Sequence, residues 1–147
     1  MANVKISELP SAAALDGTEA AAVVQGGITS QAPIQYISDY IRPYKVYSAL
    51  ISQAGTAAPT VTILENTIGN IVWTRISEGQ YQAELANAFT LNKTFLLTQQ
   101  SFASHENVFY ALDYTSDTFL YISSFDFAAA VYIDGLTNLS IEIRVYN

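Results

Sequence analysis

Hydrophobic and polar residues alternate with a period of two along most of the chain from residue 44 onward. These segments are rich in Val, Ile, Thr, Tyr and Phe, which suit a pleated, half-buried strand, and short groups of turn-forming residues separate them. The pattern predicts strands at residues 44–53, 60–66, 70–77, 80–85, 93–100, 107–114, 118–125, 129–134 and 139–147. Short, regularly spaced strands without helical patterns between them indicate a mainly β protein with an antiparallel β-sandwich or jelly-roll-like body.

Two local patterns predict further detail of the body: one buried strand face and one tight turn. In the last segment four apolar residues alternate with polar ones, so one face of that strand should lie in the core. They are Leu139, Ile141, Ile143 and Val145. A Glu-Gly pair ending at Gly79 separates two strands and predicts a tight hairpin with a positive φ at the glycine. We expect the buried residues to include Val46, Val61, Ile63, Val72, Leu85, Leu96, Phe109, Ile122, Val131, Ile141 and Ile143.

The chain before residue 44 follows a different pattern. Residues 20–24 predict one short strand, and Ile34, Ile37 and Ile41 have the spacing of one helix face. The proline before this stripe suits the first turn of a helix, and the proline after it ends the helix. Because so short a helix is marginal in water, we expect it to dock on another surface. The predicted organisation is an N-terminal arm, residues 1–43, and a β-sandwich body, residues 44–147.

Composition narrows the class of protein. Half of the residues are hydrophobic and 13% are charged, which excludes intrinsic disorder and leaves few charges to cover the surface of a monomer. A net charge of −7 argues against nucleic-acid binding, which needs clustered Lys and Arg. The sequence shows no signal peptide and no apolar stretch as long as a membrane span. It contains no cysteine, and we expect no metal and no cofactor.

Several short motifs in the first third of the chain occur in a recognisable order. They are Lys5-Ile6-Ser7, Leu9-Pro10, Gly17-Thr18-Glu19, Val23-Val24-Gln25, Gly27 and Thr29, followed by the short helix. This order resembles a recurring N-terminal segment of bacteriophage virion proteins, especially fibre and tail-associated ones. The resemblance implies a non-enzymatic virion structural protein: a head fibre, tail fibre or capsid decoration subunit, assembled in the cytoplasm of the host bacterium.

The same resemblance implies that the arm attaches the protein to the particle and that the protein is a homo-oligomer, most simply a homotrimer. The expected partners are other copies of the chain and other capsid or tail proteins. The residues expected to anchor the arm are Ile6, Leu9, Val23, Val24, Ile34, Ile37 and Ile41. An alternative is that the arm folds back on its own body as an edge strand and a covering helix.

Aromatic residues are concentrated in the second half of the body. Exposed rings can stack on sugars or anchor protein interfaces, whereas buried rings build a core or a subunit seam. The candidates for a glycan or interface contact are Tyr110, Tyr114, Tyr121 and Phe125. A module that binds host-surface glycans for host attachment is therefore an alternative function.

A third hypothesis is a small polysaccharide-degrading enzyme. Asp113, Asp117 and Asp126 flank a predicted hairpin, and paired carboxylates hydrolyse glycosidic bonds or hold Ca²⁺. Aspartates that satisfy their own turn backbone are the simpler interpretation. The single histidine, His105, is expected in a loop, so no catalytic residue is predicted.

Overall fold

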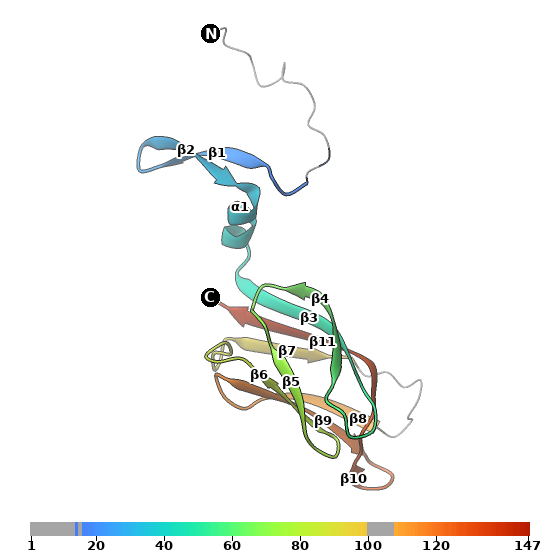
Figure 1. Ribbon diagram of the computed structural model, residues 1–147. Helices are drawn as coiled ribbons and strands as arrows, with labels where there is room; N and C mark the ends of the chain where they lie inside the picture. The colour runs from blue at the N-terminus through green and yellow to red at the C-terminus, as the bar shows by residue number, and fades with distance from the viewer. Residues whose placement is uncertain (1–13, 15, 100–107) are drawn as a thin grey trace. The chain divides into compact units, whose positions relative to one another are not determined.

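The computed structural model describes Ala14 and residues 16–99 and 108–147. These residues form two compact units, divided between Arg42 and Pro43, next to the boundary expected from the sequence (Figure 1). The described structure is mainly β, with antiparallel sheets and one helix. The one helix of the described residues lacks the length needed to cross a bilayer.

The N-terminal unit is a β-hairpin followed by a short helix. β1 (Ala20–Gln25) pairs with β2 (Ile28–Pro33), and α1 (Ile34–Ile41) follows directly. Gly26 and Gly27 form the turn with φ of 60° and 79°, and two successive positive φ values are those of the turn that matches strand twist. The sequence analysis expected a single strand here, because β2 is polar and lacks apolar alternation.

The start of α1 also differs from the expectation. Pro33 has an extended backbone, φ −54° and ψ 139°, and occupies the N-cap position at the end of β2 instead of the first helical turn. The Ile34 N–H donates to the Glu19 carbonyl at 3.1 Å, which ties the start of the helix to the residue before β1. The fixed φ of proline thus ends the hairpin and starts the helix at one residue.

The body consists of two antiparallel sheets. Its strands are β3 (Tyr44–Gln53), β4 (Thr60–Asn66), β5 (Val72–Ser77), β6 (Gln80–Glu84), β7 (Thr94–Thr98), β8 (Val108–Tyr114), β9 (Phe119–Asp126), β10 (Val131–Tyr132) and β11 (Leu136–Tyr146). One sheet has the order β4-β3-β11-β7; in the other, β9 pairs with β6, β8 and β10, and β6 pairs with β5. Each predicted segment contains a strand, and the first two strands have the predicted bounds. Residues 100 and 107, at the ends of two predicted segments, lie outside the described residues.

The first and last strands of the body are neighbours. In the β3–β11 ladder Tyr44 lies opposite Tyr146, with ring centroids 5.2 Å apart. The Asn147 N–H donates to the Pro43 carbonyl at 3.1 Å. The chain therefore enters β3 beside the place where it leaves β11.

The inner faces of the two sheets form one hydrophobic core. All four apolar residues of the alternating β11 face are buried, as predicted. The Trp73 indole N–H donates to the Tyr47 hydroxyl at 3.3 Å, joining the sheets within the core. The largest fully buried side chains are Tyr47, Tyr81, Phe89, Ile51, Leu120, Ile122, Leu136 and Ile143. The prediction of a β-sandwich is confirmed.

Four of the predicted core residues are instead exposed. Ile63 lies beside a bulge on β4, an edge strand, and Val131 lies on the two-residue strand β10. Val72 and Phe109 point to the outer face, because their neighbours Trp73 and Tyr110 occupy the inner one. Of the others, Val46, Ile122, Ile141 and Ile143 are buried, and Val61, Leu85 and Leu96 pack against the core while partly exposed.

The predicted hairpin between β5 and β6 is confirmed, and Gly79 has a φ of 62°. The Gly79 carbonyl accepts from the Ser124 N–H at 2.8 Å. A Cβ at Gly79 would lie 2.5 Å from the Ser124 carbonyl oxygen and 2.7 Å from the Ile133 nitrogen. This position therefore requires glycine both for its φ and for the close approach of β9 and the segment after β10.

Candidate functional site

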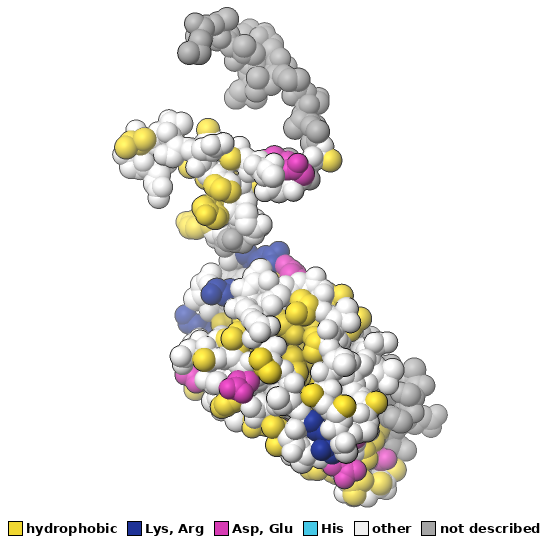
Figure 2. Space-filling model, viewed as in Figure 1, with side chains coloured by type: hydrophobic (Ala, Val, Ile, Leu, Met, Phe, Trp, Pro, Cys, Tyr) yellow, Lys and Arg dark blue, Asp and Glu magenta, His cyan; other side chains and the backbone are white. Residues whose placement is uncertain are grey.

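The N-terminal unit exposes its apolar side chains. None of residues 16–42 whose side chains are described is buried. Ile34, Ile37 and Ile41, here called the α1 stripe, line a groove of 440 Å³ together with Ser38 and Arg42. Ile41 is 72% exposed, and Figure 2 shows hydrophobic side chains on the helix. The described part of this unit therefore leaves several large apolar side chains exposed.

The other expected anchoring residues have different surroundings. Val24 is 73% exposed, whereas Val23 is partly covered. Ile6 and Leu9 lie outside the described residues. At the tip of the hairpin Ile28 is 68% exposed, an apolar surface residue that the sequence analysis did not single out. Exposed apolar residues thus occur on both the hairpin and the helix of this unit.

Four aromatic rings lie in contact on the outer face of the sheet that contains β8, β9 and β10. They are called the aromatic cluster here: Phe109, Phe125, Phe127 and Tyr132. Phe125 contacts Phe127 and Tyr132 with ring centroids 5.3 and 5.2 Å apart, and Phe109 contacts Phe127 at 5.9 Å. Phe127 is 65% exposed, and Phe109 and Tyr132 are also exposed. Contiguous exposed apolar patches mark interaction surfaces, and aromatic residues are enriched in them.

The aromatic candidates from the sequence are divided between the two faces of this sheet. Tyr110 is buried, and Tyr114 packs against the core and donates its hydroxyl to the Phe89 carbonyl at 3.5 Å. Tyr121 is on the outer face, where its hydroxyl donates to Gln82 Oε1 at 2.8 Å. Phe125 alone of the four belongs to the aromatic cluster, whereas the buried Tyr110 is part of the core, the alternative role that the sequence left open.

The sequence analysis missed the other members because it lacked the strand register. Phe109 pairs with Phe125, and Tyr132 pairs with Phe125 from the opposite neighbour strand. The alternation along β8 and β9 groups Phe109 and Phe125 with the other residues on their side of each strand, but it does not say which side faces outward. The pairing that brings these faces together, and the turn that returns Phe127 to them, come from tertiary structure.

A polar network closes one end of the body. Asp134 accepts from the Arg75 guanidinium, from the Gly79 N–H at 3.0 Å and from the Tyr81 hydroxyl at 3.3 Å. The single proton of the Tyr81 hydroxyl is shared between Asp134 Oδ1 and Gln53 Oε1, and the distance to Gln53 Oε1, 2.9 Å, is the shorter. The network links β3, β5, β6 and the connection between β10 and β11.

The electrostatics of this network indicate a structural role. The hydrogen bond from Arg75 holds the pKa of the Asp134 carboxyl below its usual value. Burial raises the pKa of the Tyr81 hydroxyl to about 12. General acid–base catalysts need pKa values near the working pH, and these two groups are shifted away from neutrality in opposite directions.

Of the aspartates considered for hydrolysis, Asp126 is remote from Asp113. Asp113 pairs with Tyr121 on β9, and Asp126 is five positions further along that strand, a separation of about 16 Å. Glycosidase carboxylates lie about 5 to 9.5 Å apart. Asp126 instead accepts from the Ala128 and Ala129 N–H groups at 2.8 and 3.2 Å, as a turn residue.

Metal ligands are not grouped within residues 16–99 and 108–147 either, because no three His, Asp or Glu side chains there are placed to hold an ion. His105 lies outside the described residues.

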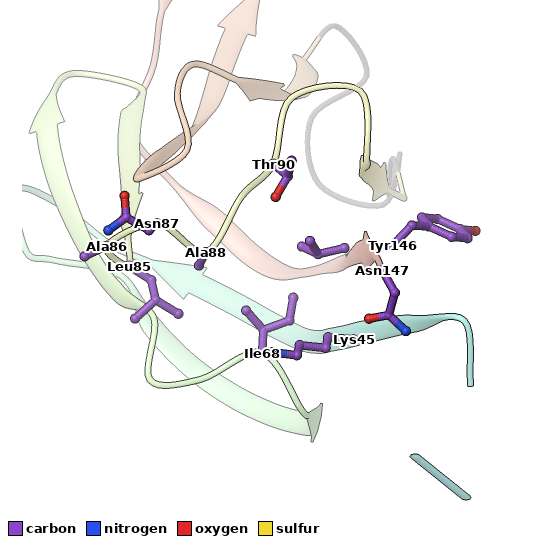
Figure 3. Close-up of a pocket in the computed structure, with 10 residues that line it drawn as sticks. Lys45, Ile68, Leu85, Ala86, Asn87, Ala88, Thr90, Tyr146 and Asn147 are labelled. Carbon is purple, nitrogen blue, oxygen red and sulfur yellow. The ribbon is translucent and has the colours of Figure 1, made fainter. Parts of the chain in front are cut away.

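A further pocket of 350 Å³ lies at the β6–β7 connection and the end of β11 (Figure 3). Ile68, Leu85 and Val145 supply apolar walls, while Lys45 and Thr90 supply polar groups. Its lining residues include no carboxylate side chain and no histidine; their titratable side chains are those of Lys45 and Tyr146. The pocket therefore offers space for a small molecule.

Comparison with known protein families, with curated proteins and with solved structures gave no match for this chain. Functional inference therefore rests on the described surfaces and on the resemblance of the N-terminal segment.

Proposed function

We propose that this protein is a structural subunit of a bacteriophage virion. In this proposal the N-terminal unit joins the subunit to the particle, and the β-sandwich body projects from it as part of a fibre, spike or decoration. The proposal has no enzymatic step. Its partners are other copies of the chain and a capsid or tail protein.

The observation that carries the proposal is that none of residues 16–42 whose side chains are described is buried. A two-stranded hairpin is marginally stable by itself, and so is an eight-residue helix. Burying a large apolar side chain contributes about 1.5 to 3 kcal/mol, so contacts with a partner through residues such as Val24, Ile28 and Ile41 would stabilise the unit. The resemblance of its sequence to virion attachment segments supplies the kind of partner.

The test is assembly in infected cells with the chain shortened to residues 43–147. The body has its own core, so we expect the shortened protein to be soluble, to give a β-type circular dichroism spectrum and to be missing from purified particles. A shortened protein found on particles at the copy number of the full chain would overturn the attachment role. The control is a Phe127→Ser full chain, which alters the body surface and keeps the N-terminal unit.

Host-glycan binding is a second candidate function, and the aromatic cluster favours it. Its rings are exposed on one face of a rigid sheet, where they can anchor a ligand. Glycan-array binding by the full chain, abolished by Phe127→Ser and retained by Val24→Ser, would support this function. Absence of saturable binding on the array would leave the cluster as a protein contact and remove the glycan role.

A further inference from the structure

The two sheets of the body differ in charge. The first sheet, β4-β3-β11-β7, together with the residue before β7, carries the bases Lys45, Lys93 and Arg144 and the acids Glu65 and Glu142. The other described residues of the body carry one base, Arg75, and six acids: Glu78, Glu84, Asp113, Asp117, Asp126 and Asp134. The whole chain has a net charge of −7, so the first sheet departs from the acidic character of the protein.

Three rings surround one of these bases where the chain enters the body. Val145 points into the core, so Arg144 and Tyr146 lie on the outer face of the first sheet, as do their strand partners Phe95 and Tyr44. The Arg144 guanidinium lies 4.9 Å from the centroid of the Tyr44 ring and 5.9 Å from that of Phe95. Phe95 is 45% exposed and Tyr146 is 40% exposed. Tyr44, Phe95, Arg144 and Tyr146 are here called the Arg144 cluster, and Figure 2 shows Lys and Arg side chains near this end of the body.

The Arg144 cluster has the composition of a strong protein contact, because Tyr and Arg dominate the residues that carry binding energy at interfaces. Its guanidinium is already held in place by the rings and by Glu142, which accepts from Nε. Nε carries only one of the N–H donors of a guanidinium, so donors remain on the Nη groups for a carboxylate of another molecule. Little side-chain freedom is left to lose on binding.

We propose that the Arg144 cluster docks onto an acidic surface of the virion protein to which the N-terminal unit attaches. This inference rests on the proposed function and adds to it a second contact and the charge of the partner's surface. Contacts made by two linked parts of one chain reinforce each other, because the first raises the effective concentration of the second.

The path of the chain and the charge select this occupant. Ile41 ends α1 and Tyr44 begins β3, so at most about 11 Å of chain separates the α1 stripe from the Arg144 cluster. A protein that covers the stripe is therefore within reach of the cluster. The excess of bases on the first sheet favours an acidic partner. A second copy fits less well, because a two-fold contact would place two basic faces against each other.

The test measures binding of the purified full chain to phage particles assembled without it, by co-sedimentation. Arg144→Gln removes a charge and Phe95→Ser removes a ring, and each should raise the apparent Kd about tenfold. The matched controls lie on the outer face of the second sheet. Gln82→Glu changes the net charge by as much as Arg144→Gln does, and Phe127→Ser removes an exposed ring; both should bind like the unchanged chain. Urea unfolding followed by Trp73 fluorescence shows that each variant is folded.

Salt tests the charge of the partner. Raising NaCl from about 0.05 M to about 0.5 M should weaken binding of the unchanged chain more than binding of Arg144→Gln, because salt screens the contact that this variant lacks. Equal salt dependence in the two chains would overturn the acidic partner. Analytical ultracentrifugation of both chains tests the other occupant: a lower mass for Arg144→Gln would make the cluster a contact between copies and overturn the proposal.

The outcomes separate this inference from the function on which it rests. If the unchanged chain binds particles and the Arg144→Gln and Phe95→Ser chains bind equally well, the docking surface is wrong and the attachment role stands. Controls weakened as much as these two variants would also overturn the docking surface. An unchanged chain that does not bind particles would overturn both.

Discussion

Arg75 and Asp134, 59 residues apart in the sequence, form a two-point ion pair at the end of the sandwich. Arg75 Nε lies 3.0 Å from Asp134 Oδ1, and an Nη lies 2.7 Å from Oδ2. The same carboxylate accepts from the Gly79 N–H and the Tyr81 hydroxyl. One side chain thus holds the β5–β6 turn against the connection that leads into β11.

Replacing Asp134 with Asn should lower the free energy of unfolding by about 1 to 3 kcal/mol, because charge-assisted hydrogen bonds are lost in a largely covered site. Urea unfolding followed by Trp73 fluorescence measures this change. The control is Glu142→Gln, which breaks the more exposed Glu142–Arg144 pair and should cost about 0 to 1 kcal/mol. Equal losses in the two variants would contradict the structural role of the network.

The Asp134 interactions should also make stability depend on acid pH. The Arg75 hydrogen bond lowers the pKa of Asp134 in the folded state below 3.8, its ordinary value. The stabilisation is therefore complete above that value and is lost as the pH falls through the lower, folded-state pKa. We expect the stability difference between the unchanged protein and Asp134→Asn to shrink as acid is added below pH 3.8. A difference that stays constant over this range would contradict the lowered pKa.

Alkaline pH should unfold the body through its buried tyrosines. Burial raises the pKa of Tyr81 from 10.0 to about 12, and it also raises the pKa values of Tyr47 and Tyr110. The neutral phenols favour the folded state, so stability is present below pH 10.0 and is lost as the pH rises toward 12. Tyr81→Phe should show a shallower loss of stability with pH, measured by urea titrations at several alkaline values. An unchanged slope would show that Tyr81 does not contribute.

Gly79→Ala should destabilise the body much more than Gly55→Ala. Both glycines have φ near 60°, but a Cβ at Gly55 meets open space, whereas one at Gly79 would clash with β9 backbone. Left-handed φ costs an L-residue about 1 to 2 kcal/mol, and the clash should at least double this at Gly79. Thermal unfolding of both variants provides the comparison. Similar melting temperatures would mean that β9 moves aside easily.

The strands of the body could be predicted because turn residues separate apolar alternation at each boundary. The two ends of β3 and β4 were located to the residue for this reason. The second strand of the N-terminal hairpin was missed because its residues are polar, although the Gly26–Gly27 pair marked the turn. Local pattern therefore located the strands that contain apolar residues and missed β2, which is mostly polar.

Burial and the candidate surfaces were harder to predict, because they depend on the strand order. Period-two parity groups Val72 with Ile76 but does not say whether that face or the face of Trp73 lies inward. The aromatic cluster is assembled by pairing of β9 with β8 and β10, whose residues are distant in sequence. The α1 stripe, by contrast, was visible in the sequence because its three members lie on one short helix.

The adjacency of β3 and β11 determines how the body would respond to force. A pull transmitted through Pro43 acts along β3, which is held between β4 and β11 on both sides. When the opposing force acts at the far end of the sandwich, the hydrogen bonds of the β3–β4 and β3–β11 ladders are perpendicular to the pulling direction. These bonds must then break together instead of one after another. A body attached through Pro43 would therefore resist tension in shear, the strong direction of a β-sheet.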